Sequence, residues 1–327
     1  MKKRALIIGG GFIGSCLARK LLEDDIEVTI FDIVTSIVEN PSLSYWDKYV
    51  YFFKLRYFDI FSKVSFVRGD VRNKYDLLDA IRKINPSTIY FLVALPQARQ
   101  NSNFSDEAFD ICVGGLHNVL ESLKFFGVNS KLVFSSSSFV YGNFPKDGIA
   151  QEDSPTNPVD VYGAHKLAAE SMIRGYGERF GLSWIIMRPI AVYGPGDIPG
   201  NRVVATFIDA AIQNEALMVN GNGEERLSFT YVGDVADGFK MIGESEEKNE
   251  IFNISSGLTY SINELIDVMK RFFPRARVEY ANVEKHRPKR GLLGISKIKS
   301  RGFEPVVSFQ DGIDREIQTI VSGRMIL

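Results

Sequence analysis

The feature that most constrains this chain is a cluster of glycines near its N-terminus. Gly9, Gly11 and Gly14 have the spacing G-x-G-x-x-G, directly after the apolar run 5–8 and within the start of a helix predicted over 12–22. In this context Gly9 permits a tight turn, Gly11 lets the backbone approach a pyrophosphate, and Gly14 lets the helix pack close to the strand. The motif therefore predicts a strand–turn–helix unit that binds a dinucleotide.

The start of this helix and the end of the next strand complete the predicted unit. Phe12 and Ile13, in the first helical turn, offer free backbone N–H groups and the positive end of the helix dipole to phosphates. Asp32 follows a strand predicted over 27–31, about 20 residues after the middle glycine. A carboxylate there accepts hydrogen bonds from the ribose hydroxyls and repels a 2′-phosphate, so the sequence predicts NAD over NADP. A glycine-rich turn without a ligand is the weaker alternative.

Strand-like and helix-like segments alternate over roughly the first 190 residues. Further strands are predicted at 64–67, 88–94, 131–134 and 183–187, and further helices at 75–84, 105–127 and 161–180. Such alternation implies an α/β fold whose parallel sheet is covered on both faces, and right-handed crossovers make it a Rossmann-type doubly wound sheet.

Glycine and proline punctuate the chain after about residue 194, and the alternation loosens. We therefore predict a dinucleotide-binding Rossmann domain over 1–193 and a smaller mixed α/β domain over 194–327 that binds the substrate. Part of the second domain is expected to cross back to the first.

An aromatic-rich insertion, residues 41–61, separates the second and third predicted strands, where a short connection would be enough. Its nine aromatic residues are Tyr45, Trp46, Tyr49, Tyr51, Phe52, Phe53, Tyr57, Phe58 and Phe61. We interpret it as an inserted helix pair packed on the domain. A dimer surface or a hydrophobic lid remains open, and insertion into a membrane surface is least favoured because basic residues there are few.

A serine, tyrosine and lysine pattern lies further along the chain. The serines 135–138 follow the predicted strand 131–134 at its carboxyl end, where open α/β sheets place their active sites. Tyr162 and Lys166 are four residues apart at the start of the helix predicted over 161–180, so their side chains share one face. Tyrosine ordinarily titrates near pH 10, and an adjacent ammonium favours the phenolate that can act as a base. A surface Tyr and Lys pair is the weaker alternative, given the serines and the glycine motif.

Composition excludes several classes of protein. The chain has 327 residues, and its 39 basic and 40 acidic side chains leave a formal net charge of −1, which argues against a nucleic-acid partner. Two cysteines (Cys16 and Cys112) and three histidines (His117, His165 and His286) disfavour a disulfide framework or a metal site. The apolar run after Met1–Arg4 is too short for a signal peptide, and no run approaches the roughly 20 apolar residues of a membrane span. We therefore expect a cytoplasmic protein without a membrane partner.

Taken together, these motifs resemble those of the extended short-chain dehydrogenase/reductases, specifically the NAD-dependent nucleotide-sugar epimerase/dehydratase family with its UDP-glucose/galactose 4-epimerase-type enzymes. The resemblance covers nearly the whole chain. Besides the glycines and Asp32 it includes Gly69-Asp70-Val71, residues 92–96, residues 115–118, Val140-Tyr141-Gly142, residues 188–196, residues 229–235 and Arg287-Pro288. The family pattern places the catalytic serine four residues before the tyrosine of V-Y-G, which is Ser137 here. The resemblance thus implies that Ser137, Tyr162 and Lys166 are catalytic.

The resemblance also implies binding residues. For NAD they are Gly9, Gly11, Phe12, Ile13, Gly14, Asp32, Asp70, Val71, Leu92, Val93, Ala94, Ser135, Tyr162, Lys166 and Pro189. For the nucleotide-sugar substrate the candidates are Gln97, Ser137, Phe139, Asn201, Arg226 and Arg287. The densest basic stretch, residues 285–290, surrounds Arg287, the position where the family binds the substrate diphosphate. A solvated basic loop is the alternative for the stretch as a whole.

Departures from the family pattern narrow the reaction. Dehydratases and decarboxylases of the family have an acid pair or a single Glu before V-Y-G, where this chain has Ser138 and Phe139. An epimerase, or a simple alcohol/ketone oxidoreductase, remains. Ala191 and Cys112 stand where the family often has Asn. The Arg of the usual R-D-F is also replaced, since the sequence reads Arg226-Leu227-Ser228-Phe229, so the nucleotide part of the substrate is not determined.

The leading hypothesis is an NAD-dependent nucleotide-sugar epimerase that works through a transient keto-sugar, by removal and return of a hydride. A sugar dehydrogenase or ketoreductase with net redox change is the first alternative, and a non-catalytic NAD-binding scaffold or sensor ranks lower. A homodimer is expected, because family members commonly pair through two long helices, here roughly 105–126 and 161–180. The first of these helices contains Phe109, Val113, Leu116 and Leu120, enough apolar side chains for two faces. Burial of these residues in a monomer core is the alternative.

Overall fold

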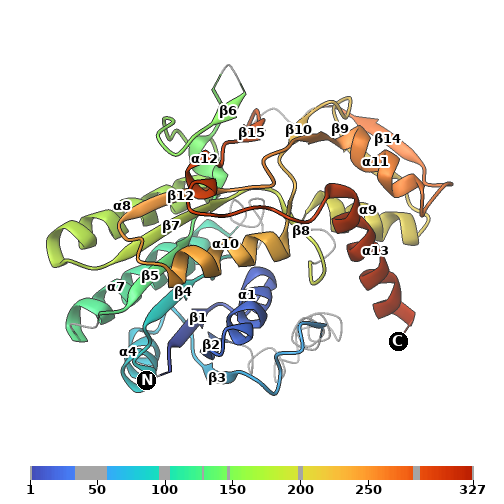
Figure 1. Cartoon of the computed structure of the whole chain (residues 1–327). Coiled ribbons are helices and arrows are strands. Elements are labelled where there is room, and N and C mark those ends of the chain that lie inside the picture. Colours follow the sequence, from blue (N-terminus) through green and yellow to red (C-terminus); the bar gives the residue numbers. More distant parts are fainter. Residues whose placement is uncertain are drawn as a thin grey trace.

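The computed structural model describes residues 2–33, 57–95, 104–126, 129–145, 148–197, 202–282 and 288–325. Its centre is a seven-stranded sheet in the order β12-β7-β5-β4-β1-β2-β3, in which every neighbouring pair is parallel (Figure 1). The strands are β1 (Arg4–Ile8), β2 (Glu27–Asp32), β3 (Ser65–Arg68), β4 (Thr88–Phe91), β5 (Lys131–Ser135), β7 (Trp184–Pro189) and β12 (Glu250–Ile254). The predicted Rossmann-type α/β class is confirmed.

The order of the strands determines where a ligand can bind. β1 pairs with β2 on one side and with β4 on the other. The first three strands therefore extend the sheet in one direction from β1, and the later strands extend it in the opposite direction, so the order of the strands reverses at β1. In open α/β sheets the crevice for ligands lies beyond the carboxyl ends of the strands at such a reversal. Gly9 and Leu92 follow β1 and β4 at this point.

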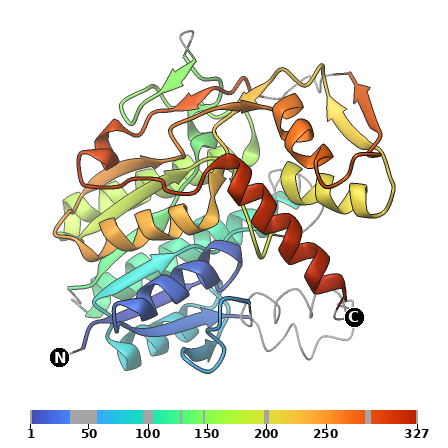
Figure 2. The ribbon, with the colours of Figure 1, turned by 45° about the vertical axis from the view of Figure 1, so that its right-hand side comes forward.

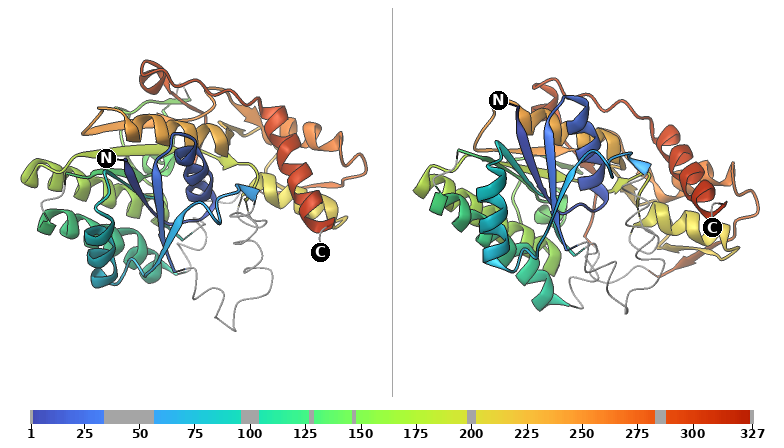
Figure 3. Two further views of the ribbon diagram at one scale, coloured as in Figure 1. Left: turned by 60° about the horizontal axis from the view of Figure 1, so that its bottom comes forward. Right: turned by 90° about the horizontal axis from the view of Figure 1, so that it is seen from below.

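Helices cover both faces of the sheet (Figure 3). Helices α1 (Phe12–Glu23) and α10 (Val232–Glu244) pack side by side on one face, and residues such as Leu17 and Phe239 contribute to its apolar core. The other face carries α4 (Lys74–Ile84), α7 (Gly115–Phe126) and α8 (Val161–Phe180), with Leu120 and Ile173 in a second core. Residues after 194 therefore contribute β12 to the central sheet and α10 to the helical layer on one of its faces.

Two predicted elements differ from the structure. The helix predicted over 105–127 is divided into α6 (Ser105–Phe109), a π-helical turn (Asp110–Gly114) and α7. A Cβ on Gly115 would lie 2.8 Å from Cγ2 of Val71, so α7 begins in close contact with the turn after β3. Apolar periodicity does not reveal a single widened turn, because the faces on either side stay apolar. The strand predicted over 88–94 ends at Phe91 in the structure, although the Leu92 N–H still donates to the Ile8 carbonyl at 2.9 Å.

The remaining elements gather beyond the sheet, at the right of Figure 1 and nearer the viewer in Figure 2. They include α9 (Val203–Ile212), α11 (Ile262–Lys270), α13 (Phe309–Met325) and the parallel pair of β9 (Leu217–Asn220) and β14 (Val278–Ala281). Tyr193, Phe229 and Phe309 pack in their shared core.

Short elements join these parts. The pairs are β8 (Val192–Tyr193) with β11 (Thr230–Tyr231), β10 (Arg226–Leu227) with β13 (Tyr260–Ser261), and β6 (Ile149–Ala150) with β15 (Leu292–Leu293), and α12 (Ser296–Lys299) follows β15. No helix within the described ranges is long and apolar enough to cross a bilayer.

Most of the aromatic insertion lies outside the described residues, which resume at Tyr57. Phe58 packs partly against the core formed with α1, whereas Tyr57 and Phe61 are 42% and 58% exposed. The choice between packing, lid and dimer surface therefore stays a prediction for this segment.

Candidate active site

The glycine turn has the geometry that its spacing predicts. Gly9 has φ +102°, its N–H donates to the Phe31 carbonyl at 3.0 Å, and a Cβ there would lie 2.8 Å from the Val93 nitrogen. A Cβ on Gly14 would overlap the carbonyl oxygen of Gly9. A Cβ on Gly11 would meet no atom within 4 Å, so its backbone faces open space. The turn therefore leaves the N-terminus of α1, with Phe12 and Ile13, accessible to a ligand.

Most predicted cofactor residues line one cavity of about 340 Å³ at the carboxyl ends of β1, β2 and β4. Of the predicted set, it is lined by Gly9, Gly11, Asp32, Asp70, Val71, Leu92, Val93 and Ala94. The Asp32 carboxylate accepts from the N–H groups of Gly10 and Ile33, both at 2.7 Å. These bonds hold a negative charge at the end of β2, where ribose hydroxyls are expected.

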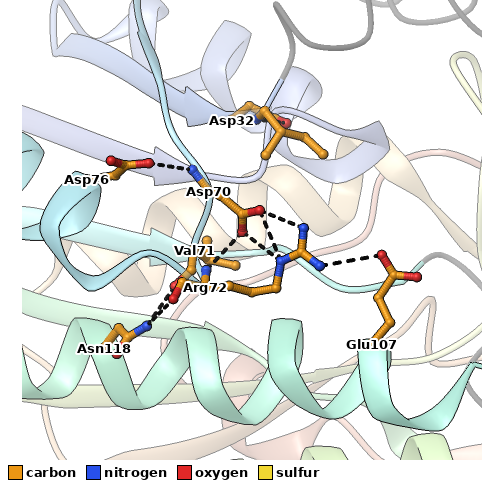
Figure 4. Close-up of polar contacts among 8 residues, drawn as sticks. Asp32, Asp70, Val71, Arg72, Asp76, Glu107 and Asn118 are labelled. Atoms are coloured by element: carbon orange, nitrogen blue, oxygen red, sulfur yellow. Dashed lines mark hydrogen bonds and ion pairs between the residues drawn. The ribbon is translucent and has the colours of Figure 1, made fainter. Parts of the chain in front are cut away.

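Three of the lining residues, Asp70, Arg72 and Glu107, form an ion-pair cluster (Figure 4). The Arg72 guanidinium bonds both carboxylate oxygens of Asp70, the shortest bond being 2.6 Å, and its Nη1 lies 3.7 Å from a Glu107 oxygen. The Arg72 side chain lowers the pKa of the Asp70 carboxyl below its ordinary value, against an opposing effect of burial. The Asn118 amide donates to the Val71 carbonyl at 2.9 Å and so ties α7 to the same turn. The sequence did not identify Arg72 or Glu107 as part of the site. The only indication was that a basic residue, Arg72, follows the predicted NAD-binding residue Asp70 by two positions.

The three predicted catalytic residues lie around the carboxyl end of β5. The Lys166 side chain is 2% exposed, its Nζ donates to the Ser135 carbonyl at 2.7 Å, and it lies 5.8 Å from the centre of the Tyr162 ring. Ser137 caps a 3₁₀ turn (Ser138–Tyr141), and its Oγ accepts from the Phe139 N–H at 3.2 Å. The Phe139 ring meets the Tyr162 ring edge to face, with centres 5.4 Å apart. The fold therefore assembles the predicted serine, tyrosine and lysine around one turn.

Close packing holds this turn against α8. The Asp160 carboxylate caps α8 by accepting from the Gly163 N–H at 2.7 Å. A Cβ on Gly163 would lie 2.6 Å from the Phe139 carbonyl oxygen, so only glycine fits there without movement of the backbone. This contact holds Tyr162, one residue earlier, beside the turn that carries Ser137.

A buried polar network underlies the same turn. Glu170 and Arg188 are 0% and 3% exposed in their side chains and form an ion pair at 2.6 Å. Ser136 donates to Glu170, Arg188 donates to the Tyr141 hydroxyl at 2.8 Å, and that hydroxyl donates to Asn253 at 2.7 Å. Burial alone would lower the pKa of Arg188, but the hydrogen bonds and the charge of Glu170 raise it well above its ordinary value. The network joins β5, α8, β7 and β12, and nothing in the sequence pattern pointed to it.

A second, larger cavity of about 650 Å³ is lined by residues of β6, β9, β10 and β15 and of the loops beside them. Arg226 lines it, and its guanidinium bonds the Thr259 carbonyl at 2.6 Å and pairs with Glu264 at 3.0 Å. Pro288 to Leu292 also line it. The charged side chains of the lining are Arg226, Lys289 and Arg290, together with Glu224 and Glu225, so the cavity includes arginines of the kind that bind a diphosphate.

Other predicted site residues lie apart from both cavities or cannot be placed. Pro189 ends β7, in register with Ile254. Gln97, Asn201 and Arg287 lie outside the described residues, so their roles stay predictions.

Comparison with known proteins points to one family. The model of the NAD dependent epimerase/dehydratase family matches residues 5–255. A protein of Methanocaldococcus jannaschii, provisionally named UDP-glucose 4-epimerase, is 31% identical over 316 residues, covering 95% of this chain and 96% of its own. The dTDP-D-glucose 4,6-dehydratase of Mus musculus is 28% identical, covering 97% of this chain and 88% of its own.

Solved structures of epimerases are also similar to this chain. The UDP-glucuronic acid 4-epimerase of Bacillus cereus, in complex with UDP-glucuronic acid and NAD, superimposes with a TM-score of 0.86 at 25% identity. That match covers 98% of this chain and 99% of the other.

Proposed function

The chain belongs to the NAD-dependent epimerase/dehydratase family, and we propose that it inverts carbon 4 of a UDP-linked sugar. It is an NAD-dependent nucleotide-sugar epimerase. The choice of UDP and of carbon 4 comes from relatives, several of which are named UDP-glucose or UDP-glucuronate 4-epimerases.

The first cavity fits NAD. Gly11 presents open backbone at the N-terminus of α1, where a pyrophosphate has room to approach the free N–H groups. Asp32, fixed by Gly10 and Ile33, offers carboxylate oxygens to ribose hydroxyls, and its charge disfavours a 2′-phosphate. When bound, NAD supplies a hydride acceptor that returns the hydride within the same catalytic cycle.

The chain's own side chains handle the proton. We assign Tyr162 as the base that takes the proton from the sugar hydroxyl and later returns it to the same oxygen. The Ser137 hydroxyl holds that oxygen, and the Lys166 ammonium favours the phenolate through its positive charge. Loss of the hydroxyl proton and of the hydride on the same carbon converts the alcohol into a ketone. Return of the hydride to the opposite face of that carbon, and of the proton to its oxygen, gives the epimer.

The observation that carries this assignment is the position of Lys166. Its ammonium is buried and donates to the carbonyl of Ser135, which lies two residues before Ser137. The same ammonium is 5.8 Å from the centre of the Tyr162 ring. A buried cation is costly unless it is paired. The Ser135 carbonyl and the Phe134 ring, whose centre is 4.8 Å from Nζ, pair this ammonium and keep its charge beside Tyr162.

A dehydratase is the reading that the mouse relative raises. That reaction needs a further carboxyl group beside the serine, which the resemblance places at the positions of Ser138 and Phe139. Residues 129–145, which the structure describes in full, contain no Asp or Glu. The Phe139 ring fills the corresponding space against Tyr162, so an epimerase is favoured.

The test is turnover of UDP-glucose, UDP-galactose and UDP-glucuronate, followed by NMR of the sugar. We expect the 4-epimer of at least one substrate, without lasting accumulation of reduced cofactor. Tyr162→Phe should lower kcat by about a hundred- to ten-thousandfold and leave the NAD content of the purified protein unchanged. Lasting reduced cofactor would instead indicate a dehydrogenase, and retained activity in Tyr162→Phe would refute the role of this tyrosine.

We also propose a homodimer that pairs through α7 and α8. Leu116 and Leu120, which suggested a second apolar face, are buried in the chain's own core. The proposal now rests on Phe109, Phe125 and Phe180, which are 49%, 77% and 43% exposed. Replacing Phe125 and Phe180 by Glu should convert the dimer into a monomer, which a sedimentation experiment measures. Tyr75→Glu, at a 79% exposed position on α4, should leave the dimer intact.

We also propose that the protein is located in the cytoplasm. Cys16 and Cys112 are free, buried thiols, as expected in a reducing compartment.

A further inference from the structure

The turn after β3 carries a carboxylate whose orientation is set by a neighbouring guanidinium (Figure 4). Oδ1 of Asp70 accepts from the backbone N–H and from Nε of Arg72, at 2.9 and 3.0 Å. Its Oδ2 accepts from Nε at 3.0 Å and from Nη2 at 2.6 Å. An ionised carboxylate offers about four lone-pair sites, so these three N–H groups leave one site for a further donor. The Asp70 side chain is partly exposed, so a ligand in the NAD cavity can reach that site.

The order of the strands indicates which part of NAD reaches this turn. The pyrophosphate is expected at the glycine turn after β1, and the catalytic residues follow β5, on the β4 side of β1. The nicotinamide half must therefore extend toward β5, and the adenosine half toward the ends of β2 and β3. Asp32, at the expected ribose position, is in register with Arg68, two residues before Asp70. This arrangement directs the adenine base to the turn that carries Asp70 and Val71.

The polar groups of this turn are complementary to one edge of adenine. Adenine has a 6-amino group that donates, and the adjacent ring nitrogen N1 accepts. On the turn, the remaining site of the Asp70 carboxylate accepts, and the Val71 N–H, which bonds no other described residue, is able to donate. Hypoxanthine carries a carbonyl at position 6 and a proton on N1, so it presents the opposite pattern. The orientation of the Asp70 carboxylate therefore determines how well the two bases are distinguished.

We propose that Arg72 is a positioning residue for adenine recognition, because its guanidinium holds the Asp70 carboxylate in the orientation that accepts from the 6-amino group of NAD. The inference rests on the proposed function only for its cofactor, and not for the sugar. A planar guanidinium suits this task because two parallel bonds restrict the carboxylate to one orientation, which a lysine ammonium does not do. The Asn118 amide, which donates to the carbonyls of Val71 and Arg72 at 2.9 and 3.3 Å, holds the backbone of the same turn.

Two other roles of Arg72 do not involve the orientation of a carboxylate. Among the described residues that line the NAD cavity, Asp32, Asp70 and Glu107 are acidic and Arg72 is basic, so the arginine balances charge near an anionic cofactor. Its Nη1 also lies 3.7 Å from a Glu107 oxygen and so joins the β3 turn to α6. Charge balance and a structural link affect every dinucleotide alike, whereas positioning of the Asp70 carboxylate affects adenine selectively.

The test measures the choice between NAD and nicotinamide hypoxanthine dinucleotide. Each protein is equilibrated with an equal excess of both dinucleotides and freed of unbound ligand, and the bound nucleotides are then quantified by chromatography. Calorimetric titration of nucleotide-free protein gives the two dissociation constants. Arg72→Gln should weaken NAD binding by about tenfold, the size expected for a lost hydrogen bond to a charged group. Binding of the hypoxanthine dinucleotide should change by no more than about twofold, so the selectivity for adenine falls.

A double-mutant cycle shows whether Arg72 acts through Asp70. Asp70→Ala removes the acceptor, and adding Arg72→Gln to it should cause no further loss of selectivity. Arg72→Lys keeps the positive charge without the fork, so it should also lose selectivity, to a smaller extent than Gln. Arg82→Gln, at an exposed arginine of α4 that lies 3.9 Å from Asp79, is the matched control and should change neither constant. Melting temperatures show whether each variant is folded, and Arg72→Lys replaces Gln if the Gln variant is not.

Three outcomes overturn the proposal. Unchanged selectivity in Arg72→Gln would show that the guanidinium is not needed to orient the Asp70 carboxylate. Equal weakening of both dinucleotides would assign Arg72 to charge balance or to the structural link, and additive losses in the double variant would show that it acts independently of Asp70. NAD binding without turnover of any UDP-sugar would instead refute the proposed substrate and leave this inference intact. Failure of the wild-type protein to bind either dinucleotide would overturn both.

Discussion

The two cavities differ in how far apart along the chain their residues lie. The NAD cavity is lined by residues between Gly9 and Ile111, and most of them directly follow a strand. The larger cavity is lined by residues between Gly148 and Leu292, which come from short strands and loops. The NAD cavity can therefore be predicted from a local motif, whereas the larger cavity forms only when segments that are distant in sequence pack together. Substitutions in the two regions should consequently fail in different ways.

Substitutions at the two glycines of the NAD turn should differ from each other in their effect on stability. A Cβ on Gly14 would overlap the Gly9 carbonyl, so Gly14→Ala should destabilise the fold by about 1–3 kcal/mol, as overpacking does. Gly11 faces open space, so Gly11→Ala should leave the apo-protein melting temperature nearly unchanged and still weaken NAD binding. Thermal melts with and without NAD measure both effects. Equal destabilisation of the two apo variants would contradict the geometry of the turn.

The largest loss of stability is expected at the buried ion pair beneath the turn that carries Ser137. Arg188→Met leaves the carboxylate of Glu170 buried without its partner, which costs about 3–5 kcal/mol. Glu170→Gln with Arg188→Met removes both charges and should recover part of that loss. Urea unfolding of the single and double variants measures the coupling. Additive losses would show that the pair is not coupled.

Glu316, on α13, offers a smaller and pH-dependent effect in the other half of the molecule. Its side chain is fully buried, and burial, helped by the charge of Asp197, raises the pKa of Glu316 well above its ordinary value. The folded protein then keeps a proton that the unfolded chain releases. The stability from this group is therefore complete below the unfolded pKa of about 4.3 and decreases as pH rises, by up to about 1.4 kcal/mol per pH unit.

Glu316→Gln removes this titration. We expect the variant to melt at a higher temperature than wild type at pH 8, and the difference to shrink toward pH 5. Asp314→Asn, on the same helix, is the matched control and should not reproduce the trend. A wild-type–variant difference that is independent of pH would show that Glu316 does not change its ionisation on folding.

The smallest effect concerns Ala191, between β7 and β8. It has φ +40°, in the left-handed region that costs a residue with a Cβ roughly 1–2 kcal/mol. Ala191→Gly removes that cost but increases the entropy of the unfolded chain, so a net gain of about 0.5 kcal/mol is expected. Chemical denaturation measures it. A loss of stability would show that contacts of the Ala191 methyl group outweigh the strain.

The accuracy of the sequence predictions follows from the range of the interactions involved. Gly9, Gly14 and Asp32 could be interpreted because each acts on atoms one turn or one strand away. The separation of Tyr162 from Lys166 by one helical turn is equally local. The π-helical turn at 110–114 was missed because one extra residue in a turn does not change which residues are apolar.

Arg290 shows why the rest could not be read from the sequence. Its basic stretch was visible, but its contact with Phe139 joins residues that are distant in sequence, and only the packing of β15 beside β6 brings them together. Arg226 was predicted as a phosphate ligand, yet its pairing with Glu264 depends on how β10 pairs with β13. Neither contact has a periodicity or a spacing that a sequence could display.

The amino-acid sequence by itself therefore determined the sheet class, the dinucleotide turn and the serine–tyrosine–lysine set, because backbone conformation and helical spacing are local properties. The tertiary structure alone decided how the Glu170–Arg188 network supports that set and which side chains line the larger cavity. Burial, charge pairing and side-chain stacking depend on which distant segments the fold places in contact.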